Sequence, residues 1–455
     1  MSPIDEKPIY ADVLGQWPQL KTYNHGSALY GAINIPRENI LREWEAAADA
    51  LTAQIPWLIE RVVHDGVSPG NTGKFYTAPW PSDLPPNKLL RFKDCTDLLL
   101  GYQELHDSQL PIQSLDGKII CPTPGFPLSY NEEEMGPAPA CIIQLNFIKD
   151  GVIVTFSNHH NVMDGTGLFN VIGMMALLLS GKSLPQEAIE QGNRDRATVV
   201  PLYPDGVTIK DHSYLHAIQV PPPPPASGPV SKWLAVRFKK SALSPLKAFA
   251  SDPEGFDKDV KFISSGDAVS ALYWKTLASI RVKQGIVNPK ASSKFSRAID
   301  ARSAVKVPMT FMGQMVHSVP TYFTHEQLIE LPLSTIASAL RKDLDATNNE
   351  YAVRSYATFI ARHPDKSKLM YTGPFNRQTD IASSSMAQAS LVLKFGLLGM
   401  PEFIRRPNLF PIPGTLYFYP PDVSGDLNLH VCLRDFEIKG LQADPLWGKA
   451  AELIG

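Results

Sequence analysis

Residues 141–179, CIIQLNFIKDGVIVTFSNHHNVMDGTGLFNVIGMMALLL, place a polar tract between two apolar segments. Cys141–Ile148 and residues 152–156 are apolar and rich in β-branched side chains, and a Lys-Asp-Gly turn joins them, so this pattern predicts a β-hairpin. Residues 167–179 are rich in Leu and Met and predict a buried helix. The tract HHNVMDG at residues 159–165 therefore lies between a strand and a helix.

Outside this stretch, hydrophobic periodicity predicts further helices and strands. Apolar side chains recur at three- and four-residue steps over residues 40–55, which predicts an amphipathic helix limited by Pro56. A second helix over residues 268–282 is expected to be capped by Ser264 or Ser265. The remaining predictions are a helix at 334–348 and strands at 236–238, 389–394, 415–419 and 427–433. This mixture indicates layered α/β domains whose sheets bury one face each.

The length and one proline run divide the chain. A chain of 455 residues is too long for one ordinary core, which favours two domains of about 200 residues. The run PPPPPASGP at residues 221–229 forms neither a helix nor a central strand and is expected to be extended. We therefore expect an N-terminal domain at 1–215, a linker at 216–230 and a C-terminal domain at 231–455.

The composition is that of a globular protein, with 44% hydrophobic and 19% charged residues. A net charge of -2 without a long block of one sign argues against nucleic acid as the main partner. No secretory signal pattern begins the chain, and the longest apolar stretches are about half of a membrane span. We therefore expect a soluble, cytoplasmic protein without a membrane partner. The four cysteines lack Cys-x-x-Cys spacing, which favours reduced thiols over a disulfide framework or a zinc site.

His160, four residues before Asp164, is the candidate general base. An unperturbed imidazole titrates near pH ~6.5 and is largely neutral in a cell, and general-base catalysis contributes roughly 10²–10⁴-fold. Asp164 could support His160 directly or fix the turn that presents it. We favour the second role, because an acidic side chain in such a turn often pairs with a distant Arg, and Gly165 permits unusual backbone conformations. A His–Asp pair at this spacing arises readily by chance, but the whole tract after an apolar hairpin is far more specific.

The segment from His160 to Gly165 matches a His-x-x-x-Asp-Gly signature, and in it the chain resembles the BAHD acyltransferases. These belong to a wider superfamily with chloramphenicol acetyltransferase and nonribosomal peptide condensation domains. Other landmarks follow in the family's order: residues 263–274 resemble its Ser/Thr-x-x-Asp-Ala helix, Asp300-Ala301-Arg302-Ser303 its Asp-x-Arg strand, and residues 394–407 its Asp-Phe-Gly-Trp-Gly region. The resemblance covers nearly the whole chain and is closest to a fungal branch that includes trichothecene 3-O-acetyltransferases.

The resemblance implies two chloramphenicol-acetyltransferase-like α/β domains, each a mostly antiparallel or mixed sheet with helices, and an active-site channel between them. His160 would lie within this channel, and Asp164 would point away from the substrate and pair with Arg302. CoA in relatives lies against the C-terminal domain. The resemblance therefore makes candidates of three residues for phosphate or pantetheine contacts: Lys247, Ser264 and Ser265.

The reaction implied is acyl transfer from acyl-CoA, with acetyl-CoA preferred, to a hydroxyl of a terpenoid or alkaloid specialised metabolite. His160 would take the hydroxyl proton, the oxygen would attack the thioester, and His160 would then protonate the departing thiolate. No acyl-enzyme is expected, because no cysteine or serine lies beside the tract. We also expect a monomer without a metal or a tightly bound cofactor.

The chain departs from the family's pattern at two places. Lys394 replaces the usual Asp of the second motif, and Leu397-Leu398 replaces its Trp region. Gln314, after Gly313, stands where relatives often have Asn. Since the second motif of relatives is distant from the base, we expect altered packing or CoA binding with activity kept.

Three alternatives stay open at this point. One is amide formation with an amine acceptor or a carrier-protein donor, although no carrier domain is attached. Another is a non-catalytic CoA-binding or metabolite-binding homologue, which the altered second motif suggests. A metal hydrolase using His159, His160 and Asp164 is disfavoured, because adjacent side chains of a strand point to opposite faces.

Overall fold

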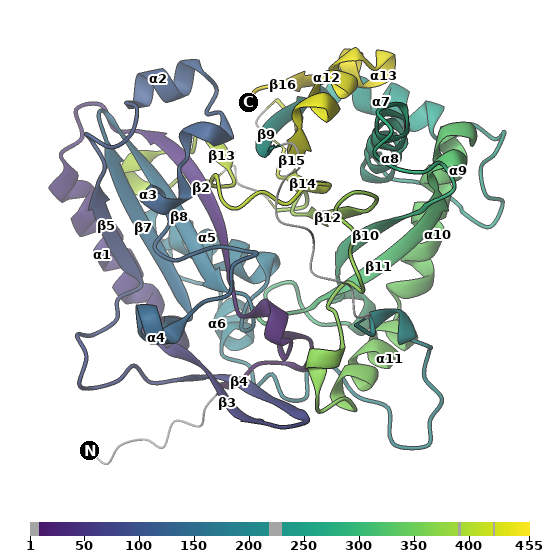
Figure 1. Cartoon of the computed structure of the whole chain (residues 1–455). Helices are drawn as coiled ribbons and strands as arrows, with labels where there is room; N and C mark the ends of the chain where they lie inside the picture. Colours follow the sequence, from purple (N-terminus) through teal and green to yellow (C-terminus); the bar gives the residue numbers. More distant parts are fainter. Residues whose placement is uncertain (1–8, 218–229, 390–392, 422–423) are drawn as a thin grey trace.

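The computed structural model describes residues 9–217, 230–389, 393–421 and 424–455. Its two main sheets lie side by side (Figure 1), one built mostly from the first half of the chain and one from the second. The proline run at 221–229, on which the predicted linker rests, lies outside the described residues. The domain boundaries at 215 and 231 therefore stay predictions.

The first half supplies four strands of a five-stranded sheet in the order β13-β2-β8-β7-β5, and the fifth, β13 (Phe403–Arg405), comes from the second half. The predicted hairpin is present as β7 and β8, and β8 extends beyond the prediction because its polar end pairs with β2, His159 opposite Tyr23. Helices α1 and α5 pack on each other and share one apolar core with the sheet. The bounds of these elements are β2 (Tyr23–Gly31), β5 (Leu90–Asp94), β7 (Cys141–Ile148), β8 (Gly151–His159), α1 (Arg37–Gln54) and α5 (Gly165–Leu179).

Beside this sheet lie a smaller sheet and several short helices. The smaller sheet has four strands in the order β1-β4-β3-β6. Its strands are β1 (Ile9–Tyr10), β3 (Arg61–Ser68), β4 (Asn71–Ala78) and β6 (Ala138–Pro139). The short helices are α2 (Tyr102–Asp107), α3 (Gly117–Ile120), α4 (Glu132–Met135) and α6 (Gln186–Gly192).

The second half builds a seven-stranded mixed sheet in the order β11-β10-β12-β14-β15-β9-β16. Strand β12 runs parallel to both of its neighbours, and the other pairs are antiparallel. The strands are β9 (Ser231–Phe238), β10 (Ser292–Asp300), β11 (Val316–Thr324), β12 (Ile381–Ser385), β14 (Thr415–Tyr419), β15 (Leu427–Arg434) and β16 (Ala451–Leu453). The helices are α7 (Lys240–Phe249), α8 (Ser265–Lys283), α9 (His325–Glu330), α10 (Leu333–Thr347), α11 (Glu350–Ala361), α12 (Asp435–Ala443) and α13 (Pro445–Ala450).

Helix α8 is the centre of the second core. It contacts helices α10, α12 and α9, and its buried side chains share one apolar cluster with the sheet. Ser264 caps its first turn, as the sequence predicts, with its hydroxyl accepting from the Asp267 amide at 3.1 Å. The expected α/β class, with mixed and antiparallel sheets covered by helices, is thus confirmed.

One strand crosses between the two halves. Strand β13 (Phe403–Arg405) belongs to the second half of the sequence but pairs with β2, with Phe403 opposite Leu29 and Arg405 opposite Ser27. Figure 1 shows this yellow-green strand at the edge of the purple-to-blue sheet. The sheet of the first half is therefore completed by residues near the end of the chain.

The strand predicted at 389–394 is not observed at its described residues. The strand of this region is β12, which ends at Ser385, and residues 389, 393 and 394 are irregular, whereas 390–392 lie outside the described residues. Strand β12 has the sequence IASSS and lies inside the sheet between β10 and β14. Its serines lack the apolar pattern from which an inner strand is predicted.

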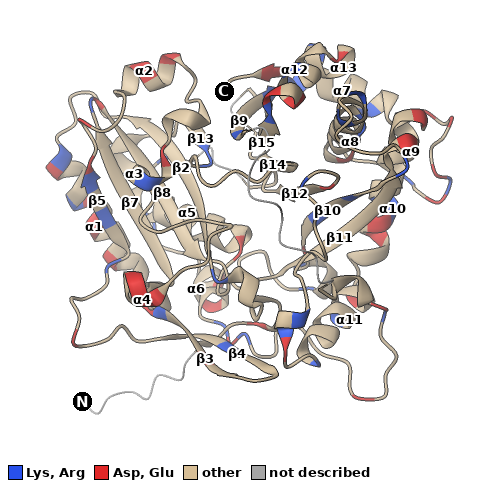
Figure 2. Cartoon of the chain, viewed as in Figure 1, with Lys and Arg blue, Asp and Glu red and all other residues tan. Residues whose placement is uncertain are grey.

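Charged residues of both signs are interspersed over the two halves (Figure 2). In the described part of the chain, no helix combines the length and apolar character needed to span a bilayer.

Candidate active site

The tract forms a five-residue turn between a strand and a helix. Strand β8 ends at His159, and helix α5 begins at Gly165. Asp164 is the N-cap of α5, and its Oδ1 accepts from the Gly167 amide at 2.9 Å, which satisfies one of the free amides of the first turn. We call residues 160–164 the base turn.

Hydrogen bonds from several segments hold the base turn along its whole length. The His160 amide donates to the Thr22 carbonyl at 2.8 Å, which continues the pairing with β2. The Asn161 side chain donates to the carbonyls of Gly15 and Trp17 at 2.6 and 2.8 Å. Asn158 donates to the Met163 carbonyl at 2.6 Å. The backbone that carries His160 is therefore fixed from both sides.

The His160 ring has one buried and one accessible nitrogen. The side chain is partly exposed, and its Nδ1 is buried without a hydrogen-bond partner among the described residues. Nε2 is not one of the buried, unpartnered nitrogens and is the atom open to solvent. Burial lowers the pKa of His160, against smaller opposing effects of its own backbone and of the Asp164 charge. The ring is therefore neutral near pH 7, and its accessible nitrogen can accept a proton.

His159 has a different environment. It is 1% exposed, its ring packs edge-on against Tyr23 with 5.1 Å between centroids, and burial lowers its pKa to about 3. Such a ring has no access to a substrate. No cluster of three or more His, Cys, Asp or Glu side chains suited to a metal ion occurs in the described part of the chain.

Asp164 and Arg302 form a two-pronged ion pair with no solvent exposure. Arg302 lies two residues after the end of β10, and its Nη1 and Nη2 donate to the two carboxylate oxygens of Asp164 at 2.8 and 2.9 Å. The Met315 amide also donates to Oδ2 at 2.8 Å. With the Gly167 amide on Oδ1, each carboxylate oxygen accepts two hydrogen bonds. No hydrogen bond joins Asp164 to the His160 ring in the described residues.

The Arg302 guanidinium is fully bonded as well. Besides its two bonds to Asp164, it donates from Nε to the Phe311 carbonyl at 3.0 Å, from Nη2 to the Gly313 carbonyl at 2.8 Å and from Nη1 to Asp300 at 2.8 Å. A guanidinium has five N–H groups, so none is left unpaired. Asp300 in turn accepts from the Thr166 hydroxyl at 2.7 Å, which ties the start of α5 to the end of β10.

Two charged residues beside the base turn were not predicted as site residues from the sequence. Arg196 is 1% exposed and donates from Nη1 to the Val162 carbonyl at 2.5 Å. Asp12 is equally buried, and burial raises its pKa to about 7, with Arg196 opposing the shift. Both stand in irregular segments outside any motif, and Arg196 acts on a backbone carbonyl, so no spacing in the sequence indicated them.

The three candidate CoA contacts lie on the second half of the chain, away from the base turn in sequence. The Ser264 hydroxyl donates to Asp267 at 2.8 Å as well as capping α8, so this side chain has a structural partner. Lys247 lies in α7 and Ser265 begins α8, and neither side chain makes a hydrogen bond among the described residues. No described bond links any of the three to His160.

The altered second motif packs on the first half. The Phe395 ring is buried and stacks with Trp44 of α1, with 6.0 Å between centroids. The Leu397 amide donates to Glu43 of α1 at 2.9 Å. A side chain at Gly396, whose φ is +52°, would overlap the same carboxylate. Lys394 itself is exposed, so its replacement of an acidic residue lies at the surface.

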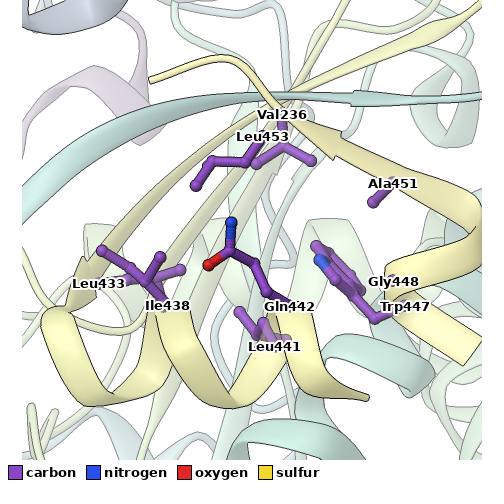
Figure 3. A pocket seen from close by; sticks show the side chains of 9 residues that line it. All are labelled: Val236, Leu433, Ile438, Leu441, Gln442, Trp447, Gly448, Ala451 and Leu453. Carbon is purple, nitrogen blue, oxygen red and sulfur yellow. The ribbon is translucent and has the colours of Figure 1, made fainter. Parts of the chain in front are cut away.

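Neither of two cavities formed by the described residues includes a residue of the base turn. One of about 240 Å³ lies between the outer strands of the second sheet and helices α12 and α13, and Gln442 points into it among apolar side chains (Figure 3). The other, of about 350 Å³, lies beside Pro56 and Trp80. The channel expected between the halves stays a prediction.

Two family models match the chain. Residues 30–177 match the trichothecene 3-O-acetyltransferase-like N-terminal domain, and residues 126–445 match the Transferase family. An O-acyltransferase of Monascus ruber is 43% identical over 98% of each chain. An O-acetyltransferase of Aspergillus niger is 36% identical over 98% of this chain and 97% of its own length.

Solved structures show the same fold over the whole length. TRI101 of Fusarium graminearum, complexed with coenzyme A and T-2 mycotoxin, has a TM-score of 0.89 at 29% identity and covers 99% of this chain and 100% of its own. Vinorine synthase, with a TM-score of 0.63 at 15% identity, covers 96% of this chain and 93% of its own and shares the fold alone.

Proposed function

The chain belongs to the Transferase family, and from this premise we propose that it is an acyl-CoA-dependent O-acyltransferase in which His160 is the general base. The observation that carries the proposal is the His160 ring, which is neutral, open at Nε2 and set on a turn fixed by hydrogen bonds. A base needs this combination of a free lone pair and a fixed position.

The proposed reaction is a direct transfer. Nε2 of His160 takes the proton of the acceptor hydroxyl while the oxygen attacks the carbonyl carbon of the thioester. The tetrahedral intermediate then collapses, the carbon–sulfur bond breaks, and the imidazolium returns its proton to the CoA thiolate. The products are an ester and free CoA, and the histidine ends in its initial state.

Asp164 and Arg302 have structural roles in this proposal, whereas Gly165 begins α5 without a positive φ, so the unusual backbone conformation expected there is not observed. The Asp164 oxygens are occupied by the amides of Gly167 and Met315 and by the Arg302 guanidinium. The carboxylate therefore fixes the start of α5 and joins the two halves, and the electrostatic effect on His160 is secondary. This supports the role that the sequence favours for Asp164.

The substrates follow from the relatives. The solved structures of TRI101 hold coenzyme A together with T-2 mycotoxin or deoxynivalenol. We propose acetyl-CoA as the donor and a hydroxyl of a specialised metabolite as the acceptor. We infer that Lys247 and Ser265, whose side chains make no hydrogen bond among the described residues, are freer to contact CoA than Ser264, which is engaged by Asp267. A cytoplasmic monomer is part of the proposal.

The test is release of free CoA thiol from acetyl-CoA by the wild type, by His160→Ala and by His216→Ala. His216 is an exposed histidine outside the site and serves as the matched control. The acceptors are a panel of hydroxylated terpenoids and alkaloids, with amines included. We expect acceptor-dependent release by the wild type and by His216→Ala, and a loss of roughly 10²–10⁴-fold in His160→Ala with unchanged CoA affinity.

Full activity of His160→Ala would refute its role as the base. Release with amines alone would favour amide formation, and CoA binding without transfer over the whole panel would favour a non-catalytic homologue.

A further inference from the structure

The Val162 carbonyl, in the middle of the base turn, points at a buried guanidinium. Arg196 donates to it from Nη1 at 2.5 Å, and among the described residues this is the only side-chain hydrogen bond to Val162. Val162 lies two residues after His160, so a shift of this carbonyl turns the peptide units that carry the base. The guanidinium therefore holds the segment between His160 and Asp164.

Arg196 is itself held by an aromatic face. Its guanidinium lies 4.3 Å from the centre of the Trp57 ring, and Trp57 is anchored by a hydrogen bond from Nε1 to the Gly192 carbonyl at 2.9 Å. Guanidinium groups stack on indole with favourable energy, and more so when both are out of water. This stack fixes the direction in which Nη1 points.

The same guanidinium is otherwise short of partners. Its Nε and Nη2 are buried without hydrogen bonds among the described residues. Burial lowers the pKa of Arg196 to about 10, and Asp12 is the first of the charges that oppose this. Asp12 is buried too, and its Oδ2 has no hydrogen-bond partner in the described part of the chain. Each residue is therefore the main source of opposite charge for the other.

Asp12 reaches the base turn by a second route. Its Oδ1 accepts from the Gly15 amide at 3.0 Å and so closes the 3-10 helix Val13–Gly15. The carbonyls of Gly15 and Trp17 then accept from the side chain of Asn161, the residue after His160. Gly15 is in such close contact that a side chain there would overlap the Asn161 carbonyl. Asp12 and Arg196 thus restrain consecutive residues of the turn.

We propose that Arg196, with Asp12 as its counter-charge, is a positioning residue for His160. The proposal rests on the proposed function, because it concerns how the base is aimed. Arg196 contacts neither ring nitrogen and holds no proton in the reaction. It fixes the Val162 carbonyl, and a displacement of about 1 Å at a reacting group can cost about 10²-fold in rate.

The first measurement is steady-state transfer by Arg196→Ala. We expect kcat to fall about 10²-fold, with CoA affinity within about twofold of the wild type, because the turn and not the binding surface is disturbed. Added guanidinium ion should restore part of kcat by occupying the vacated place on Trp57. Arg354→Ala is the matched control, since Arg354 lies over the Tyr203 ring at the same 4.3 Å and donates to a backbone carbonyl at 2.9 Å, but is far from the base turn in sequence and near the surface.

The second measurement does not depend on activity. Hydrogen–deuterium exchange of peptides covering residues 158–167 should be faster in Arg196→Ala than in the wild type, and unchanged in Arg354→Ala and His160→Gln. If Arg196→Ala does not fold, Arg196→Lys takes its place, because it keeps the charge and can reach the Val162 carbonyl but lacks the planar fork. We then expect a smaller fall in kcat and a smaller rise in exchange.

The outcomes separate the two proposals. Wild-type kcat or unchanged exchange of residues 158–167 in a folded Arg196 variant would overturn the positioning role. A fall in kcat accompanied by an equal loss of CoA affinity and no rescue by guanidinium would also overturn it. Faster exchange in Arg196→Ala, in a protein whose wild type transfers no acyl group to any acceptor, would uphold the restraint of the base turn by Arg196 but refute the proposed function and, with it, the positioning of a base.

Discussion

The two buried arginines that hold the base turn are bonded in opposite ways. Arg302, from the second half of the chain, uses all five N–H groups and pairs with both oxygens of Asp164. Arg196, from the first half, makes one hydrogen bond to Val162 and lies on the Trp57 ring. Equal burial therefore has opposite results. At Arg302 the effect of burial, which would lower the pKa, is outweighed by the charges of Asp164 and Asp300, and the pKa is raised. At Arg196 the effect of burial prevails, and the pKa falls to about 10.

We call the Arg302 side of the turn locked, because every N–H group of that guanidinium is bonded. We call the Arg196 side adjustable, because two of its guanidinium nitrogens have no hydrogen-bond partner among the described residues. A buried charge is stable only when paired and hydrogen-bonded, and removing one partner of a complete pair is costly. The Arg302 side is such a complete pair and makes the two halves one unit. The Arg196 side has unused donors, so its hold on the turn responds to nearby charge.

The largest effect is expected for Arg302→Ala, which removes the arginine whose N–H groups are all bonded. The change leaves Asp164 buried without its counter-charge, and we expect a loss of about 3–5 kcal/mol in the free energy of unfolding, measured by urea titration. Lys342→Ala is the control, since its two ion pairs with Asp257 and Asp259 are exposed, and such pairs contribute little to stability. Equal losses in the two variants would contradict the distinction between locked and solvated pairs.

Gly167→Ala tests how closely the locked side is packed. A methyl group at this position would overlap the Met312 carbonyl and the Met163 side chain, so we expect a destabilisation of about 1–3 kcal/mol. Gly173→Ala lies in the same helix with no atom within 4 Å of the added methyl, and should be neutral or stabilising by up to about 1 kcal/mol. Thermal unfolding of both variants is followed by circular dichroism. A lower melting temperature in Gly167→Ala alone would confirm close packing at the start of α5, and equal melting temperatures would contradict it.

Asp12→Asn examines the adjustable side through pH. Burial raises the pKa of Asp12 from 3.8 to about 7. Between pH 3.8 and pH 7 the carboxyl group is therefore protonated in the folded state but ionised in the unfolded state. Stability of the wild type should therefore fall as pH rises, by about 1.4 kcal/mol between pH 6 and 8 from this group. The asparagine variant should lose this component. A pH profile of the unfolding free energy that is identical in both proteins would place the titration elsewhere.

The smallest effect is expected at Lys394, in the segment that also joins the halves. Its side chain is exposed, whereas the neighbouring Phe395 is buried between Trp44 and Tyr30. Lys394→Ala should change stability by less than about 0.5 kcal/mol and leave kcat unchanged. Phe395→Ala, the buried comparison, should cost about 3–5 kcal/mol. A large loss of transfer in Lys394→Ala would show that the altered motif takes part in catalysis.

The sequence predicts those parts that depend on local patterns. The hairpin of β7 and β8, helix α5 and the Ser264 cap follow from alternation, periodicity and a capping residue, and the structure confirms them. The partner of Asp164 was indicated only by resemblance, because Arg302 is 138 residues away.

The rest depends on contacts that leave no local pattern. Strand β12 is formed by serines because its two parallel neighbours satisfy its backbone, and β13 has three residues whose pairing with β2 spans the length of the chain. Arg196 and Asp12 stand in irregular segments, and their burial is decided by tertiary packing alone.

The 138 residues between Asp164 and Arg302 also set a schedule for biosynthesis. A ribosome adds about 5–20 residues per second, so the nascent chain exposes Asp164 for roughly 7–28 s before its guanidinium partner is made. Strand β13 is synthesised later still, so the edge of β2 with which it pairs stays unpaired until then. During that interval the unpaired edge of β2 is open to wrong strand pairing.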